Sequence, residues 1–62
     1  PAIEEIAQMP YSEARSKVLH EFESFYLPRI LSDARGNVSQ ASRQAKMDRN
    51  HLRELLKRHG LD

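Results

Sequence analysis

The chain has 62 residues, of which 39% are apolar and 31% charged, with a formal net charge of +1 at pH 7 and no cysteine. This length allows a single domain whose core rarely supplies more than ~3–5 kcal/mol of stability, and the cysteine count excludes disulfides and thiolate metal sites. No apolar run approaches the ~20 residues of a membrane span, and no signal peptide is visible. We therefore expect a binding module of cytoplasmic location, without a membrane partner, that self-associates or belongs to a longer protein.

The charges are distributed unevenly along the chain. Three basic residues stand against six acidic ones through residue 34, a net charge of −3, and seven stand against three from residue 35 onward, a net charge of +4. A polyanionic partner would therefore be met by the second half of the chain. The alternative is a pair of solvated helix faces with an incidental charge bias.

Residues 1–10 predict a linker or a short helix. Ile3, Ile6 and Met9 would form the apolar side of a helical turn within Pro1–Gln8, and Pro10 would stop it. Isolated helices of this length are marginal in water, so both interpretations stay open.

Residues 11–35 predict a long helix. Ser12 is a suitable N-cap, and Glu13 suits the positive end of the helix dipole. Apolar residues then recur at helical spacing, and the periodicity resumes beyond Pro28. We therefore predict one kinked helix in preference to two separate ones.

This helix has apolar residues on two sides. One stripe comprises Ala14, Val18, Phe22, Phe25, Ile30 and Ala34, and the other comprises Leu19, Tyr26, Leu27 and Leu31. A helix in so small a domain cannot bury both faces within its own chain, so the second face requires a partner. We expect a homodimer, with Leu19, Phe22, Tyr26, Leu27 and Ile30 at its interface.

Residues 36–62 predict two further helices. Gly36 fits the left-handed position that ends a helix, and Asn37 can cap the next helix, Val38–Ala45. Lys46-Met47-Asp48 predicts a three-residue turn, with Asp48 capping a last helix from Arg49. Leu52, Leu55 and Leu56 form the buried stripe of that helix, and Gly60 terminates it.

The spacing of apolar residues in this region predicts a helix-turn-helix motif. The motif needs apolar contacts four apart on the first helix, one in the turn, and two that are three apart on the second helix. Ala41, Ala45, Met47, Leu52 and Leu55 satisfy the pattern, and Ser42 supplies a small residue where the helices cross. A helical hairpin without DNA-binding activity would satisfy it as well.

The exposed face of the last helix carries the candidate DNA contacts. The first turns of a recognition helix enter the major groove, where Arg pairs with guanine and Asn with adenine, so we expect base contacts from Arg49, Asn50, His51 and Arg53. Phosphate contacts are expected from Asn37, Ser39, Gln40, Lys57 and Arg58. The alternative is a set of solvated surface residues, with Asn37 acting as a cap in either case.

Three segments resemble the Fis-type helix-turn-helix family: Gly36-Asn37-Val38-Ser39-Gln40-Ala41, Met47 to Arg53, and Leu56-Lys57-Arg58-His59-Gly60-Leu61. That family includes the nucleoid protein called factor for inversion stimulation and the C-terminal domains of bacterial sigma-54-dependent, nitrogen regulator C-like enhancer-binding activators. The stretches Tyr11-Ser12-Glu13-Ala14-Arg15 and Phe22-Glu23-Ser24-Phe25-Tyr26-Leu27 are especially similar to the activators.

The resemblance implies an all-α, Fis-like domain in which a long dimerisation helix precedes the helix-turn-helix. It implies a bacterial, nucleoid-associated homodimer that recognises an enhancer-like inverted repeat in double-stranded DNA. Sigma-54 RNA polymerase would be contacted, and ATP hydrolysed, only by domains outside this chain. At the family's DNA-contacting positions stand Asn37, Ser39, Arg49, His51, Arg53, Lys57 and Arg58.

Two residues depart from the family pattern. Lys46 stands where the turn usually has glycine, so either the turn geometry differs or a lysine accepts a strained conformation. Glu54 stands where relatives carry a basic or polar residue, and its carboxylate would repel phosphate or select for cytosine.

The sequence gives little support for metal binding or catalysis. His51 and Glu54 have no third metal ligand at helical spacing, and His20 beside Glu21 and Glu23 is most simply a polar surface edge. No catalytic triad or phosphate-binding loop can be assembled, so we expect no enzyme activity, no metal and no cofactor. The competing interpretations are a helical dimerisation or docking module, and a Fis-like nucleoid protein without strict sequence specificity.

Overall fold

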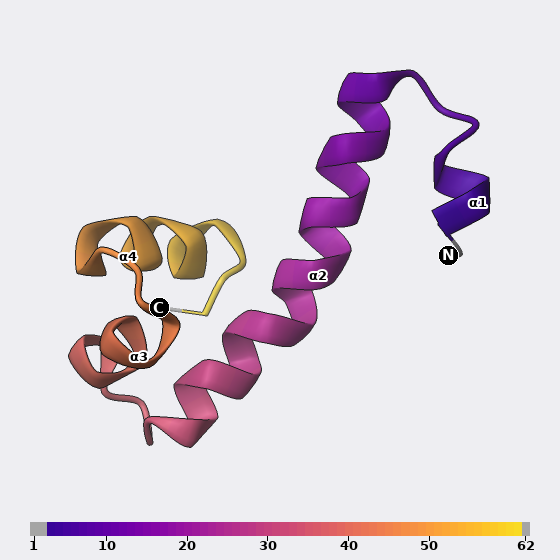
Figure 1. The fold of residues 1–62 in the computed structure, drawn as a ribbon. Coiled ribbons are helices and arrows are strands. Elements are labelled where there is room, and N and C mark those ends of the chain that lie inside the picture. The colour runs from indigo at the N-terminus through magenta and orange to yellow at the C-terminus, as the bar shows by residue number, and fades with distance from the viewer. Residues whose placement is uncertain (1–2, 62) are drawn as a thin grey trace.

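The computed structural model describes residues 3–61, which fold into four helices and no strand. These are α1 (Ile3–Ile6), α2 (Tyr11–Asp33), α3 (Val38–Ala45) and α4 (Arg49–Arg58). Figure 1 shows that the long helix α2 connects the other three: α1 folds back against its first half, and α3 and α4 pack at its C-terminal end. The expected all-α fold class is confirmed.

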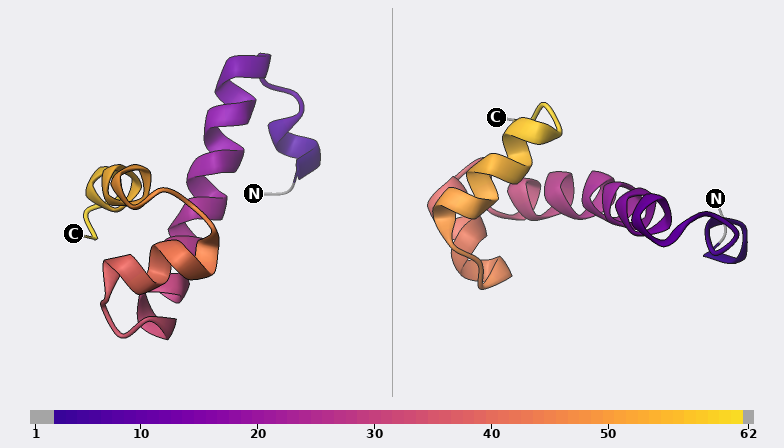
Figure 2. Two further views of the ribbon diagram at one scale, coloured as in Figure 1. Left: turned by 60° about the vertical axis from the view of Figure 1, so that its left-hand side comes forward. Right: turned by 90° about the horizontal axis from the view of Figure 1, so that it is seen from above.

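The two ends of α2 carry separate parts of an elongated molecule of 38 × 20 × 18 Å. Figure 2 shows α1 at one end and the α3 and α4 helices at the other. None of the helices within residues 3–61 is long and apolar enough to cross a membrane.

The short helix α1 was one of two interpretations left open for residues 1–10. It runs over Ile3–Ile6, a shorter span than the residues 1–8 considered, the first two of which lie outside the described residues. Ile6 is buried against α2, whereas Ile3 remains exposed. One apolar anchor therefore holds this turn in place.

Helix α2 starts one residue earlier than its expected cap. Pro10 precedes the first turn and makes no side-chain hydrogen bond to it, so Ser12 lies inside the helix and does not cap it. Pro28 does not interrupt the helix, which confirms one helix in preference to two. Figure 1 shows its axis leaning over in the C-terminal half, as expected for an internal proline that removes a backbone donor.

Two residues with a left-handed backbone follow the end of α2. Gly36 was expected in this conformation, and Arg35 adopts it as well. Arg35 has φ 54° and Gly36 has φ 81°. The Gly36 N–H donates to the Leu31 carbonyl at 2.9 Å, and the Arg35 N–H donates to the Ser32 carbonyl at 3.0 Å. This pair of bonds satisfies the last carbonyls of α2 and reverses the chain toward α3.

The hydrophobic core lies where the second half of α2 meets α3 and α4. Its buried members are Leu27, Ile30, Ala34, Ala41, Leu52, Leu55 and Leu56. Leu27 and Ile30 were expected at a dimer interface, and this expectation is wrong. Both side chains are buried within the chain's own core, because the C-terminal half of α2 packs them against α3 and α4, and they are not accessible to a second copy.

Candidate nucleic-acid interface

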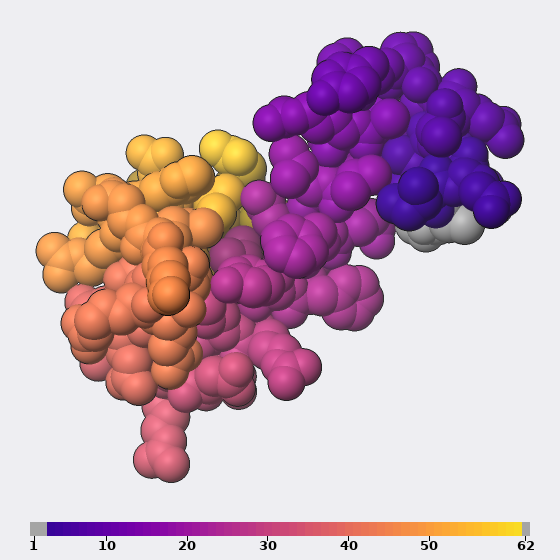
Figure 3. Space-filling model, viewed as in Figure 1, coloured from indigo at the N-terminus to yellow at the C-terminus, as the bar shows by residue number. Residues whose placement is uncertain are grey.

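Residues 38–58, which we call the α3–α4 unit, form two helices joined by the expected three-residue turn. Ala41 and Leu52 are fully buried between the helices, and Ser42 is buried at the position expected for a small residue. Ala45 and Met47 pack half-buried at the edge of the core. The predicted pattern of apolar contacts is therefore present in the packed structure. Figure 3 shows this unit as a lobe apart from α1 and the start of α2.

Side-chain caps fix the start of both helices in the unit. The Asn37 side-chain oxygen accepts a hydrogen bond from the Gln40 N–H at 3.1 Å. The Asp48 carboxylate accepts from the Asn50 N–H at 3.0 Å and from the His51 N–H at 3.2 Å. These bonds define the first turn of each helix. Asn37, expected to contact phosphate, thus has a capping role in the free protein.

Lys46 adopts the conformation usually left to glycine in this turn. Its backbone is left-handed, with φ 54° and ψ 47°. The following Met47 N–H donates to the Ser42 carbonyl at 3.0 Å, closing the end of α3. Of the two explanations considered for this lysine, the structure supports the second: the turn is closed as a glycine would close it, and the lysine accepts the strain.

Helix α4 presents a continuous polar face. Leu52, Leu55 and Leu56 are buried, and the remaining seven residues are exposed. These are Arg49, Asn50, His51, Arg53, Glu54, Lys57 and Arg58. The expected base-contacting residues are therefore all accessible, and four of the seven exposed side chains carry positive charge.

Two of the expected DNA-contacting residues lie against each other. The Arg49 guanidinium donates from Nη1 to the Ser39 Oγ at 3.2 Å, across the crossing of α3 and α4. This contact orients a long, flexible side chain toward the start of α3. Both residues were expected at DNA, and the bond between them was not predictable from their spacing in the sequence.

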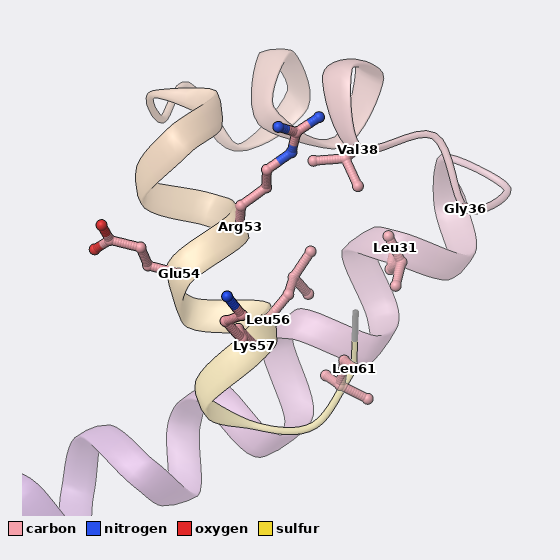
Figure 4. A pocket seen from close by; sticks show the side chains of 8 residues that line it. All are labelled: Leu31, Gly36, Val38, Arg53, Glu54, Leu56, Lys57 and Leu61. Atoms are coloured by element: carbon pink, nitrogen blue, oxygen red, sulfur yellow. The ribbon is translucent and has the colours of Figure 1, made fainter.

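A hollow of about 410 Å³ lies beside α4, at the base of the Arg53 side chain. Figure 4 shows its apolar walls, made by Leu31, Val38, Leu56 and Leu61, with Arg53 extending over Val38 and Glu54 turned away. Arg53 therefore lies along apolar surface with its guanidinium free at the edge of the polar face.

The end of α4 is tied to the middle of α2 by a contact that the sequence analysis missed. The Nε2 of His59 lies 2.9 Å from Oε1 of Glu23, and both side chains are largely buried. The His20 ring stacks on the His59 ring with 5.0 Å between centroids. His20 and Glu23 were interpreted as a polar surface edge, which is wrong for Glu23, whose side chain is largely buried in this contact, whereas His20 remains exposed. The one available indication was the position of His59, which continues the spacing of the buried Leu52, Leu55 and Leu56 one residue beyond the end of α4.

A second candidate surface lies on α1 and the first half of α2. Leu19, Phe22 and Phe25 are exposed, the last two by 56% and 79%, and Phe22 stacks on the half-buried Tyr26 at 5.1 Å. An apolar groove runs beside them, lined by Ile3, Ile6, Ala7, Tyr11, Ala14, Arg15, Val18 and Leu19. Of the five residues expected at a dimer interface, Leu19, Phe22 and Tyr26 remain available.

No protein-family model, no curated protein and no solved structure matches this chain. Among residues 3–61 no group of three or more acidic or histidine side chains is arranged to hold a metal ion.

Proposed function

We propose that this chain binds double-stranded DNA as a homodimer, with α4 in the major groove. The observation that carries the proposal is the face of α4, where Arg49, Arg53, Lys57 and Arg58 are exposed together with Asn50, while the leucine stripe of the same helix is buried. A ten-residue helix is about 15 Å long, and the major groove, about 12 Å wide, admits a helix. Cations on such a face supply the non-specific attraction to phosphates.

The remaining expected contacts fit this placement. Arg49, Asn50 and His51 form the first turn of α4, which enters deepest in a helix-turn-helix complex, and Arg53 follows one turn later. Lys57 and Arg58 lie in the last turn, nearer the phosphates. Ser39 and Gln40, at the start of α3, would meet the backbone on the near side of the groove.

The exposed side chains of the first half of α2 support the homodimer. Leu19, Phe22 and Phe25 would be covered by a second copy related by a twofold axis. Two symmetry-related α4 helices would then read an inverted repeat with half-sites about one helical turn, ~10–11 bp, apart. The Fis-type resemblance supports the finer proposal that the chain is the C-terminal DNA-binding domain of a sigma-54-dependent regulator.

Selection from a random duplex library, followed by binding measurements at several salt concentrations, tests the proposal. Arg49→Ala and Arg53→Ala are expected to lose about 1–3 kcal/mol on the selected site and to relax base preference. Lys57→Ala and Arg58→Ala are expected to weaken selected and random DNA alike and to lower the salt slope by about one each.

Lys17→Ala is the matched control, since it removes an exposed positive charge from α2, away from the α4 face. It is expected to leave both affinities almost unchanged. Absence of duplex binding by the unmodified chain at low salt, with α2 pairing intact, would instead support the docking-module alternative. That alternative is favoured by the exposed Phe22 and Phe25.

A further inference from the structure

Glu54 lies near the midline of the exposed face of α4. Side chains advance by about 100° per residue around a helix, so the stripe that contains Asn50, Glu54 and Lys57 stands opposite the stripe of Leu52, Leu55 and Leu56. The leucines are buried in the core, and Glu54 is exposed. A negative charge thus occupies the outermost part of the surface that carries four positive ones.

The carboxylate of Glu54 is not neutralised by its neighbours. In residues 3–61 the one ion pair joins His59 and Glu23, and no hydrogen bond involves the Glu54 side chain. Figure 4 shows Glu54 projecting away from Arg53 and Lys57. The charge is therefore available to an external donor.

A helix lying in the major groove directs its midline at the base edges and its flanks at the two phosphate backbones. Phosphate would repel a carboxylate on the flank, whereas a carboxylate on the midline meets the exocyclic amino groups of cytosine and adenine. Adenine also presents its N7 acceptor beside N6, which repels a second acceptor, while cytosine presents N4 as a donor alone. Cytosine is therefore the base that a carboxylate at this place selects.

We propose that Glu54 is a specificity-determining residue that accepts a hydrogen bond from the N4 amino group of one cytosine in each half-site. This inference rests on the proposed function, because it requires α4 in the major groove. Two roles were considered for Glu54, repulsion of phosphate and selection of cytosine. The proposal favours selection of cytosine.

The test compares the base preference of the unmodified chain with that of Glu54→Ala, which removes the acceptor, and Glu13→Ala, which removes an exposed carboxylate from α2. Selection by the unmodified chain is expected to fix one C·G pair per half-site, and replacing that pair by T·A is expected to lower affinity about tenfold. Glu54→Ala is expected to bind the two duplexes equally and to bind random DNA more tightly, because a negative charge is lost. Glu13→Ala is expected to keep the preference.

A double-mutant cycle with DNA sharpens the result. Replacing the selected cytosine by 2-pyrimidinone, which lacks the N4 amino group, is expected to weaken binding of the unmodified chain about tenfold more than binding of Glu54→Ala. If Glu54→Ala raises affinity for every duplex by one factor and keeps the same selected sequence, the inference is overturned while the proposed function stands. If the unmodified chain binds no duplex at all, both fall together.

Discussion

The two ends of α2 differ in the burial of their apolar side chains. Every large apolar residue that is exposed within residues 3–61 precedes Leu27, and of the buried apolar residues Ile6 alone does so. The C-terminal part builds a core from three helices, whereas the N-terminal part lays its aromatic rings on the surface. One continuous helix thus leaves its N-terminal apolar side chains exposed and packs its C-terminal ones into the core.

The charge follows the same division. The first 34 residues carry a net −3 and the rest a net +4, so the part of the sequence that holds the exposed apolar side chains is acidic and the part that holds the α3–α4 unit is basic. If two copies pair through their N-terminal parts, their basic units remain free to face a polyanion.

The core prediction concerns Leu52, which has no exposed surface. Leu52→Ala is expected to lower the free energy of unfolding by about 2–5 kcal/mol, because it leaves a cavity between α2, α3 and α4. Urea unfolding followed by circular dichroism measures the loss. Phe25→Ala, which truncates a side chain that is 79% exposed, is the matched truncation, and at concentrations where the chain is monomeric it should cost little. Equal losses under those conditions would contradict the division drawn above.

The association prediction concerns Phe22, which is exposed and does not belong to the core. Phe22→Glu is expected to shift sedimentation from dimer toward monomer, because a charge would have to be buried against a second copy. It should also remove the dependence of the melting temperature on protein concentration that linked association produces.

Ser24→Glu is the control for association, since Ser24 is exposed on a different side of α2. It should leave the sedimentation pattern as it was. An unmodified chain that stays monomeric, with a melting temperature independent of concentration, would remove the dimer from the proposal.

The prediction for the contact between α2 and α4 concerns Glu23. Glu23→Ala leaves the largely buried Nε2 of His59 without its partner and is expected to cost about 1–3 kcal/mol of unfolding free energy. Glu23→Gln retains a side-chain oxygen and should recover part of the loss. Hydrogen exchange should show faster opening at the end of α4 in Glu23→Ala. An unchanged exchange pattern would mean that the contact does not stabilise the end of α4.

The smallest effect is expected at Lys46, whose φ of 54° is strained for a side chain with a Cβ. Lys46→Gly is expected to stabilise the fold by about 0.5–1 kcal/mol, the relief of strain exceeding the entropy lost by a glycine. Ala45→Gly, one residue earlier and still within α3, should instead destabilise by about the same amount. The same sign for both variants would show that the left-handed turn carries no strain.

Sequence patterns predicted the local structure of residues 36–61 closely. The limits of α3 and the first residue of α4 follow from Asn37 and Asp48, because caps act within three residues of themselves. The predicted start of α2 at residue 11 agrees with the structure, but its cap was misplaced at Ser12, because serine is a frequent cap whereas Pro10 precedes this helix. Such local rules predict where helices lie but not which part of an apolar stripe is covered.

Contacts between distant residues escaped prediction. Ile30 lies on the same predicted stripe as Phe22 and Phe25, and the packing of α3 and α4 against the C-terminal half of α2 decides that Ile30 is buried while the two phenylalanines are exposed. Glu23 and His59 are 36 residues apart, so no helical spacing connects them. The accessibility of the α4 face was predictable from the leucine stripe, whereas the Arg49–Ser39 bond depends on how α3 and α4 cross.

The unbroken course of α2 has a consequence for how this chain tolerates change. Each residue added to a helix turns everything beyond it by about 100° and moves it by about 1.5 Å. One insertion between Phe25 and Leu27 would swing the α3–α4 unit by more than a quarter turn around α2, away from its present orientation relative to the exposed rings. Residues 7–10, which lie between two helices, impose no such register. The number of residues in α2 is thus more tightly constrained than the identity of its solvent-facing ones, and natural variants should gain or lose residues before Tyr11 rather than after it.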